Sequence, residues 1–152
     1  MRHPLPPLGS PGPLAGVRVI ELCNTFAGPA CARLLADFGA DVIKVEDTGM
    51  GDYARWSPPY YEGVQDSAKS ALFLSLNRNK RSLRIDLKSD GGRDAFLRLA
   101  RTADVVLESF RPGVLDRLGV GFDRLREENP RLVCCAISGY GQRNAWSHRA
   151  GH

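Results

Sequence analysis

The sequence predicts an α/β fold: one three-layer domain built on a mostly parallel sheet. Short β-branched apolar runs alternate along the chain with segments of helical periodicity. The connections between them are short, and a strand–helix–strand unit of this kind requires parallel strands with a right-handed crossover. A length of 152 residues suits one domain with a substantial core, and 43% hydrophobic with 25% charged residues is typical of a globular protein.

The first third of the chain predicts one strand–helix–strand unit. Residues 17–22 are a β-branched apolar run and are predicted to form a strand. A loop over 23–27 leads to Gly28-Pro29, where a helix begins, because proline is well tolerated in a first helical turn. Gly39 is a typical helix stop, and residues 41–46 are the second strand.

The central third predicts a long loop and two further elements. Residues 47–70 have no clear period and are rich in glycine, proline and aromatic residues; such a loop in a compact domain is usually functional or mobile. Residues 72–76 are apolar and fit either a helix or a strand. Residues 83–87 alternate like a strand, and a helix opens at Asp90 or Gly91.

The last third predicts two strands with short helices between them. Residues 104–108 are a strand, 112–118 and 123–128 are short helices, and 132–137 is the final strand. Because residues 132–137 are nearly all apolar, we expect this strand to be central and covered on both faces.

The connections after the strands are the candidate ligand site, because ligands of such sheets bind beyond the carboxyl ends of the strands. All of these connections gather at one edge of the sheet. They are residues 23–28, 47 onward, 88–91, 109–113 and 138–142.

The charge of the chain suggests an anionic partner. The net charge is +4, and four cations fall within seven residues: Arg78, Lys80, Arg81 and Arg84. Such a cluster suits a nucleic acid, a phosphorylated cofactor or simply a solvated surface. Aromatic residues are not interleaved with it, so we predict no nucleic-acid partner. No apolar run approaches the ~20 residues of a membrane span, so we predict no membrane partner.

The cysteines argue against a metal site. The chain has four, Cys23, Cys31, Cys134 and Cys135, with no C-x-x-C pair and no histidine at metal spacing. Cys134 and Cys135 lie in an apolar run and are expected to be buried. We therefore predict no metal, and a reducing, cytoplasmic setting.

Three segments carry candidate binding chemistry. Small residues at 27–30 allow an anion to approach a helix N-terminus. Residues 77–82 concentrate cationic and amide donors, and in 108–113 Phe110 offers a ring for a purine beside Arg111. Taken singly, each is equally compatible with a tight turn, a solvated charged run or a core phenylalanine. No G-x-G-x-x-G follows the first strand, which argues against a nicotinamide dinucleotide.

Taken together and in order, these segments resemble the family III CoA-transferases, which include the 2-methylacyl-CoA racemases. The resemblance covers about residues 13–152. It is carried by PLAGVRVIEL at 13–22, ADFGADVIKVE at 36–46, NRNKRSL at 77–83, ESFRPG at 108–113, NPRL at 129–132, SGYGQ at 138–142 and the terminal Gly151-His152.

The resemblance implies a Rossmann-like large domain that binds an acyl-CoA at the strand ends, a smaller second domain, and an interlocked homodimer. It implies contacts to coenzyme A from Thr25, Phe26 and Ala27, from Asn77, Arg78, Lys80 and Arg81, and from Ser109, Phe110, Arg117 and Leu118.

The implied reaction is the transfer of coenzyme A between carboxylic acids. An aspartate, expected directly after His152, would attack the acyl-CoA and form an aspartyl intermediate. Two alternatives remain open. In a 2-methylacyl-CoA racemase His152 would be the base that exchanges the α-proton. A non-catalytic module would bind coenzyme A or another adenine nucleotide without chemistry.

The sequence also suggests how the chain is organised. We expect residues 1–13 to be a flexible Pro-rich leader and 14–152 to be the N-terminal CoA-binding part of the large domain. Because the nucleophile and second domain are absent from the sequence, we expect a truncated, inactive fragment. Asp47 departs from the basic residue that many members carry, and Arg143 departs from their G-Q-x-G-P pattern.

Overall fold

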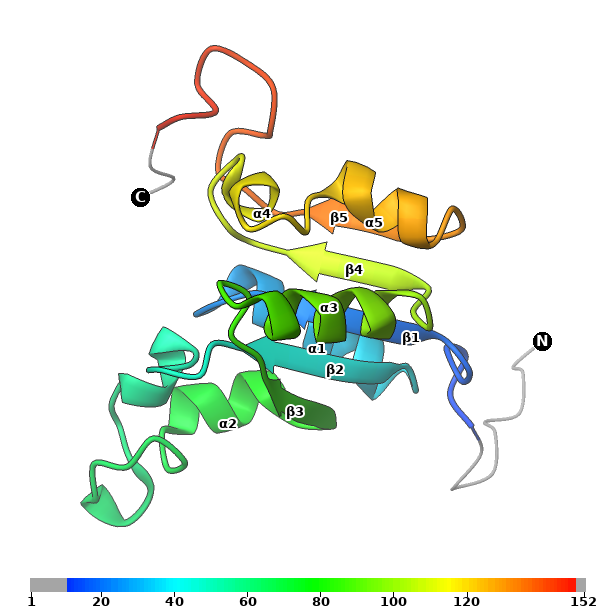
Figure 1. Cartoon of the computed structure of the whole chain (residues 1–152). Coiled ribbons are helices and arrows are strands. Elements are labelled where there is room, and N and C mark those ends of the chain that lie inside the picture. Colours follow the sequence, from blue (N-terminus) through cyan, green and yellow to red (C-terminus); the bar gives the residue numbers. More distant parts are fainter. Residues whose placement is uncertain (1–10, 150–152) are drawn as a thin grey trace, which may run out of the picture.

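A five-stranded parallel sheet organises the molecule. The computed structural model describes residues 11–149. All neighbouring strands pair in parallel, in the order β3-β2-β1-β4-β5 (Figure 1). The predicted α/β class with a parallel sheet is therefore confirmed. The strands are β1 (Arg18–Leu22), β2 (Asp41–Glu46), β3 (Lys80–Arg84), β4 (Val105–Glu108) and β5 (Val133–Ala136).

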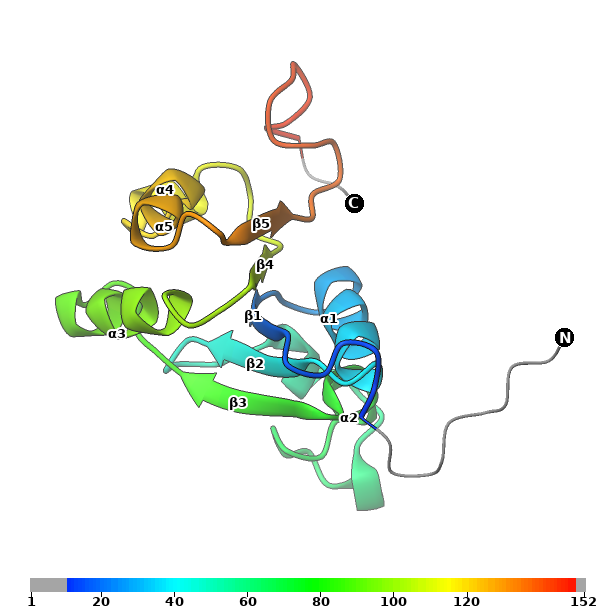
Figure 2. The same ribbon diagram turned by 90° about the vertical axis from the view of Figure 1, so that its right-hand side faces the viewer.

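Helices cover both faces of the sheet and complete three layers. Figure 2 shows α1 (Ala27–Asp37) and α2 (Ala71–Asn77) on one side. The other side carries α3 (Asp90–Ala100), α4 (Val114–Arg117) and α5 (Phe122–Glu128). Within residues 11–149 no helix is long and apolar enough to cross a membrane.

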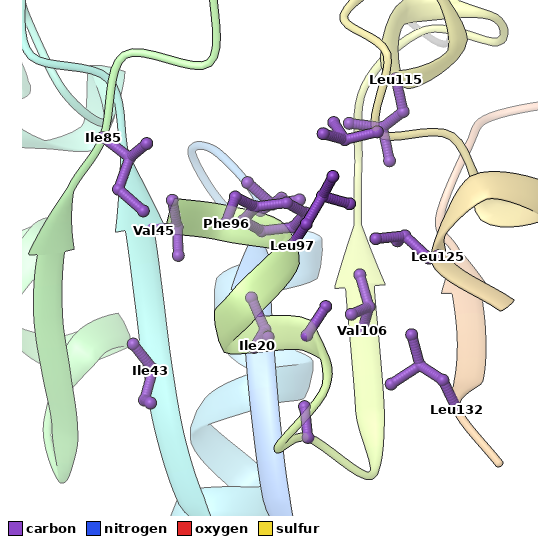
Figure 3. Packing of buried hydrophobic residues seen from close by; sticks show 14 residues of the cluster. Ile20, Ile43, Val45, Ile85, Phe96, Leu97, Val106, Leu115, Leu125 and Leu132 are labelled. Atoms are coloured by element: carbon purple, nitrogen blue, oxygen red, sulfur yellow. The ribbon is translucent and has the colours of Figure 1, made fainter. Parts of the chain in front are cut away.

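The core forms in two parts because side chains alternate across each strand. On the α3 face, Ile20 and Val106 of the central strands pack with Phe96 and Leu125, and all four are fully buried (Figure 3). On the α1 face a second cluster includes Val19, Val42, Ala32 and Ala36. Burying a side chain such as Phe96 or Ile20 contributes about 1.5–3 kcal/mol.

Local signals explain where the helices begin and end. Gly39 has a φ of 99° and directly follows the end of α1, as predicted. The ambiguous segment 72–76 lies in α2, because the Ser70 hydroxyl caps the helix by accepting from the Phe73 amide at 3.3 Å. Ser89 caps α3 in the same way. The long connection between β2 and α2 contains two short 3-10 turns, η1 (Tyr53–Trp56) and η2 (Tyr61–Gly63).

The predicted position of the third strand was wrong by three residues. The strand runs over Lys80–Arg84 rather than 83–87. Asp86 instead forms a turn, since its carboxylate accepts from the Lys88 amide and its carbonyl from Ser89. The pairing places Lys80 beside the buried Val42. A lysine at a covered strand position has no apolar signature, so the alternation further on was mistaken for the strand.

The prediction that 132–137 is central was also wrong. Within residues 11–149, β5 pairs only with β4 and lies at the edge of the sheet. Val133 is 59% exposed and Cys135 is exposed, so the expected burial of that cysteine was wrong as well. An apolar run shows that its side chains favour burial, but it does not specify how many strands pair with it.

Candidate functional site

The strand order reverses between β1 and β4. From β1 the chain builds β2 and β3 on one side, and then it crosses to β4 and β5 on the other. Ligands of open parallel sheets bind outside the carboxyl ends of the strands at such a reversal. Two connections leave the sheet there (Figure 1), residues 23–26 after β1 and residues 109–113 after β4, and we call them the switch-point loops.

The two switch-point loops touch each other. The Asn24 amide donates to the Ser109 hydroxyl at 3.2 Å. Thr25, Phe26 and Ala27 are exposed beside this contact, so the structure brings these three predicted residues together with Ser109. A Cβ on Gly28 would lie 2.4 Å from the Cys23 sulfur and 3.4 Å from the Ser109 Cβ. The packing of the first turn of α1 against Cys23 therefore requires glycine at position 28, whereas the distance to Ser109 is an ordinary van der Waals contact.

The remaining residues predicted on this side occupy the second loop and α4. Phe110 and Leu118 are half-buried and pack against the core cluster of the α3 face. Arg117 is exposed on α4, which begins after Gly113 in a left-handed conformation, φ 78°. Of these three residues, Arg117 is the one with a charged side chain, and it is exposed.

A polar cavity of about 280 Å³ adjoins the second switch-point loop. Its floor includes Glu108, the last residue of β4, which is only 5% exposed. The Glu108 carboxylate accepts from the Phe110 amide at 2.7 Å, and the Gln142 side chain lies 3.5 Å from its other oxygen. The charged residues of the wall are Arg111, Arg126, Arg143, Asp116 and Asp123.

Burial changes the acidity of this carboxyl group. Desolvation raises the pKa of Glu108 to about 6, and the charge of Asp116 adds to the rise. The Phe110 amide opposes the shift, because it stabilises the carboxylate. Glu108 therefore changes charge near neutral pH inside a cavity that also holds three arginines.

A group of buried charges lies beneath the first switch-point loop, on the α1 face. We call Glu21, Lys44, Asp52 and Lys80 the buried ion cluster; each side chain is at most 2% exposed. Lys44 contacts Glu21 at 3.0 Å and Asp52 at 2.8 Å, and Lys80 contacts Glu21 at 2.7 Å. Two cations and two anions make the cluster neutral.

The two lysines of the cluster respond differently to burial. Desolvation alone would lower the pKa of Lys44, but the carboxylates of Glu21 and Asp52 outweigh it and raise the pKa. Lys80 has one carboxylate partner, so desolvation prevails and its pKa is lowered. Lys44 is therefore held firmly in its charged form by its two partners.

The exposed arginines of residues 77–82, which we call the cationic segment, lie away from the switch-point loops and are already engaged in ion pairs. Arg78 pairs with Asp37 at 2.7 Å, at the C-terminal end of α1. Arg81 pairs with Asp41 at 3.1 Å, at the start of β2. Ten residues of helix separate Ala27 from Asp37, which is roughly 15 Å. The structure therefore does not bring Arg78 and Arg81 together with the switch-point loops.

Lys80 and Asn77 form a separate link within this segment. The Lys80 ammonium donates to the Asn77 side chain and to the Pro29 carbonyl, both at 2.9 Å. Asn77 in turn donates to the Phe73 carbonyl. Lys80 therefore ties β3 to the first turn of α1 and does not face solvent.

Sequence reasoning missed Glu21, Lys44, Asp52 and Glu108. A signal for the first two exists: each is a charged residue inside an apolar strand, with apolar neighbours on both sides. Asp52 has no such signal in the sequence, because it lies in a loop without hydrophobic periodicity. His152 lies outside the described residues. Among residues 11–149 no group of three or more His, Cys, Asp or Glu side chains is arranged to hold a metal ion.

Comparison with known proteins gives consistent matches over nearly the whole chain. The family model for CoA-transferase family III matches residues 14–152. A succinyl-CoA:mesaconate CoA-transferase from Haloarcula hispanica is 45% identical over 141 residues, which is 92% of this chain and 35% of that protein. A formyl-CoA:oxalate CoA-transferase from Rhodopseudomonas palustris is 45% identical over 130 residues, 84% of this chain and 29% of the relative.

Solved structures agree with the sequence matches. A CAIB/BAIF family protein from Brucella suis superposes with a TM-score of 0.85 at 41% identity, covering 94% of this chain and 38% of that one. A hypothetical protein from Mycobacterium tuberculosis gives a TM-score of 0.81 at 42% identity, covering 93% and 38%. The chain thus spans about a third of the length of the relatives it matches.

Proposed function

This chain belongs to CoA-transferase family III, and from that premise we propose that it provides the acyl-CoA-binding part of an enzyme that moves coenzyme A between carboxylic acids. The proposal concerns residues 14–152 as the N-terminal part of the large domain. The ligand is a small molecule, an acyl-CoA thioester.

The observation that carries the proposal is the contact between the two switch-point loops. Thr25, Phe26 and Ala27 follow β1, and Ser109 follows β4, at the point where the strand order reverses. Exposed side chains and the first turn of α1 meet here, where a helix N-terminus favours negative charge. A nucleotide with phosphate groups suits this edge of the sheet.

The cavity beside Glu108 supports the same proposal. Its three arginines, Arg111, Arg126 and Arg143, offer guanidinium groups to phosphate or carboxylate oxygens. Arg117 is exposed on the neighbouring helix α4. An anionic ligand that extends from the switch-point loops along this side would meet these groups in turn.

Calorimetric titration of the protein with coenzyme A tests the proposal. We expect Arg117→Ala to weaken binding about tenfold, the loss of one charge-assisted hydrogen bond. The matched control is Arg131→Ala, because Arg131 is exposed before β5, at the opposite edge of the sheet. Absence of binding at millimolar coenzyme A, or equal losses in both variants, would contradict the proposal.

We favour transfer over α-proton exchange, since the relatives compared above are named as CoA-transferases. The racemase alternative depends on His152 as the base. We also propose that these 152 residues have no turnover alone, because the aspartyl intermediate requires a nucleophile that they do not supply. Measurable CoA transfer or α-proton exchange by this chain alone would refute that part.

We further propose a cytoplasmic location. All four cysteines are free thiols, which suits a reducing compartment. Fractionation of cells that express the protein tests this, and recovery with the periplasmic or extracellular fraction would contradict it.

A further inference from the structure

The buried ion cluster has an unusual set of hydrogen-bond partners outside itself. Lys44 donates to the Cys23 carbonyl at 2.8 Å, and Lys80 donates to the Pro29 carbonyl at 2.9 Å. The Thr25 amide donates to the Asp52 carboxylate, also at 2.8 Å. Three of the four charged side chains therefore hold main-chain groups at the start of the β1–α1 connection, in its middle and in the first turn of α1.

The middle contact is the one with the strongest conformational demand. Thr25 has a φ of 69°, a left-handed conformation that a β-branched residue adopts only when its surroundings impose it. The Thr25 amide donates its hydrogen bond to the Asp52 carboxylate, and this carboxylate is itself fully buried. The hydrogen bond to Asp52 thus accompanies the one strained residue of the loop.

Asp52 is in turn fixed from three directions. Its own amide donates to Glu46 at 2.9 Å, and Glu46 is held by Arg55 through two contacts of 2.7 Å. The Asp52 carboxylate also caps η1 by accepting from the Ala54 amide at 2.9 Å. Lys44 neutralises its charge at 2.8 Å. The carboxylate therefore presents a rigid acceptor to the β1–α1 connection.

From this geometry we infer that Asp52 is a positioning residue: its carboxylate sets the shape of the loop 23–26 in which the acyl-CoA is bound. The inference rests on the proposed function for its ligand, and Asp52 itself does not touch the ligand. Replacing a buried charge set of this kind by apolar residues is often neutral or stabilising, so stability alone does not account for its position.

The test compares two double variants that differ only in the side chain at position 52. Lys44→Met with Asp52→Asn removes one charge of each sign, so the remaining Glu21 and Lys80 stay paired, and the Asn side chain retains an oxygen for the Thr25 amide. Lys44→Met with Asp52→Ala makes the same charge change without that oxygen. Thermal unfolding of both reports whether the fold is kept.

The two readouts for this pair of variants are the hydrogen exchange of the Thr25 amide and the affinity for coenzyme A. We expect the Ala variant to exchange Thr25 at least tenfold faster and to bind coenzyme A at least tenfold more weakly than the Asn variant. Equal exchange and equal affinity in two folded variants would overturn the inference. If coenzyme A binds neither variant nor the unaltered protein, the proposed function fails, while the exchange rates still decide whether Asp52 holds the loop.

A measurement on the unaltered protein covers the case in which the Ala variant does not fold. Because Thr25 and Ala54 share the Asp52 carboxylate, coenzyme A should slow the exchange of both amides. The Ala68 amide donates to the exposed Asp66 at 2.8 Å, with the same spacing in sequence, and is the matched control. Slower exchange at Thr25 with Ala54 unchanged would overturn the inference.

Discussion

The Gln142 side chain lies 3.5 Å from the buried carboxylate of Glu108, and this contact joins the loop after β5 to the end of β4. Gly141 precedes it with a φ of 83°, which allows the chain to turn back over the cavity. Two connections of the carboxyl edge therefore meet at one titratable group, whose charge depends on pH in the neutral range.

We expect Glu108→Gln to stabilise the protein at pH 7. The folded pKa of about 6 lies above the ordinary glutamate pKa of 4.5, so the folded state binds the proton more tightly. Stability from this group is present below pH 4.5 and is lost as the pH rises through 6. This rise in pKa corresponds to about 2 kcal/mol, less any weakening of the Phe110 hydrogen bond.

Urea unfolding at pH 4.5 and pH 7 checks this prediction. The variant should gain about 1–2 kcal/mol over the parent at pH 7 and nothing at pH 4.5. Glu62→Gln, at an exposed carboxylate, is the control and should show no such pH dependence. A variant that is less stable than the parent at pH 7 would contradict the assigned burial of Glu108.

We expect Lys44→Met to be strongly destabilising, by about 3–5 kcal/mol, because it leaves the buried Asp52 carboxylate without its cation and Glu21 with Lys80 alone. Adding Asp52→Asn should recover at least half of the loss, since charge balance returns. Lys69→Met breaks an exposed pair with Glu62 and should cost at most about 1 kcal/mol. Additive losses for Lys44 and Asp52 in urea unfolding would show that they are uncoupled.

The sequence predicts the parallel sheet and most of its helices, because hydrophobic periodicity and helix-ending residues are local signals. Strand 41–46 is predicted from its apolar run after Gly39, and the predicted opening of a helix at Asp90 or Gly91 agrees with α3. The buried ion cluster is not predictable in this way. It joins residues from three strands and a loop, and only the register of β3 against β2 brings Lys80 to Glu21. This register buries Lys80 of the cationic segment, whereas Arg78 and Arg81 remain exposed.

The contact between Gly28 and Cys23 predicts a cost for any side chain at position 28. An added Cβ would lie 2.4 Å from the Cys23 side chain, which is buried under α1. We expect Gly28→Ala to lower the free energy of unfolding by about 1–3 kcal/mol through overpacking. In the control Gly91→Ala, no atom lies within 4 Å of the added carbon in α3, and we expect a gain of about 0.5–1 kcal/mol. Equal changes by urea unfolding would contradict the close approach.

Substitutions at Arg78 and Lys80 report on different properties of the cationic segment: Lys80 affects stability, and Arg78 can be tested for ligand binding. Lys80→Met would leave Glu21 with Lys44 alone and should cost about 3–5 kcal/mol of stability, so it cannot report on binding cleanly. Arg78 is 58% exposed and pairs with Asp37 at the surface, so Arg78→Ala should change stability by at most about 1 kcal/mol.

If the segment contacts coenzyme A, as its resemblance to family members implies, Arg78→Ala weakens binding by about 1–3 kcal/mol. Arg124→Ala, another exposed and ion-paired arginine, is the control. Coenzyme A titrations with the same affinity for Arg78→Ala and the parent would remove Arg78 from the ligand site, and the proposed contacts would then be the switch-point loops, Arg117 and the cavity beside Glu108.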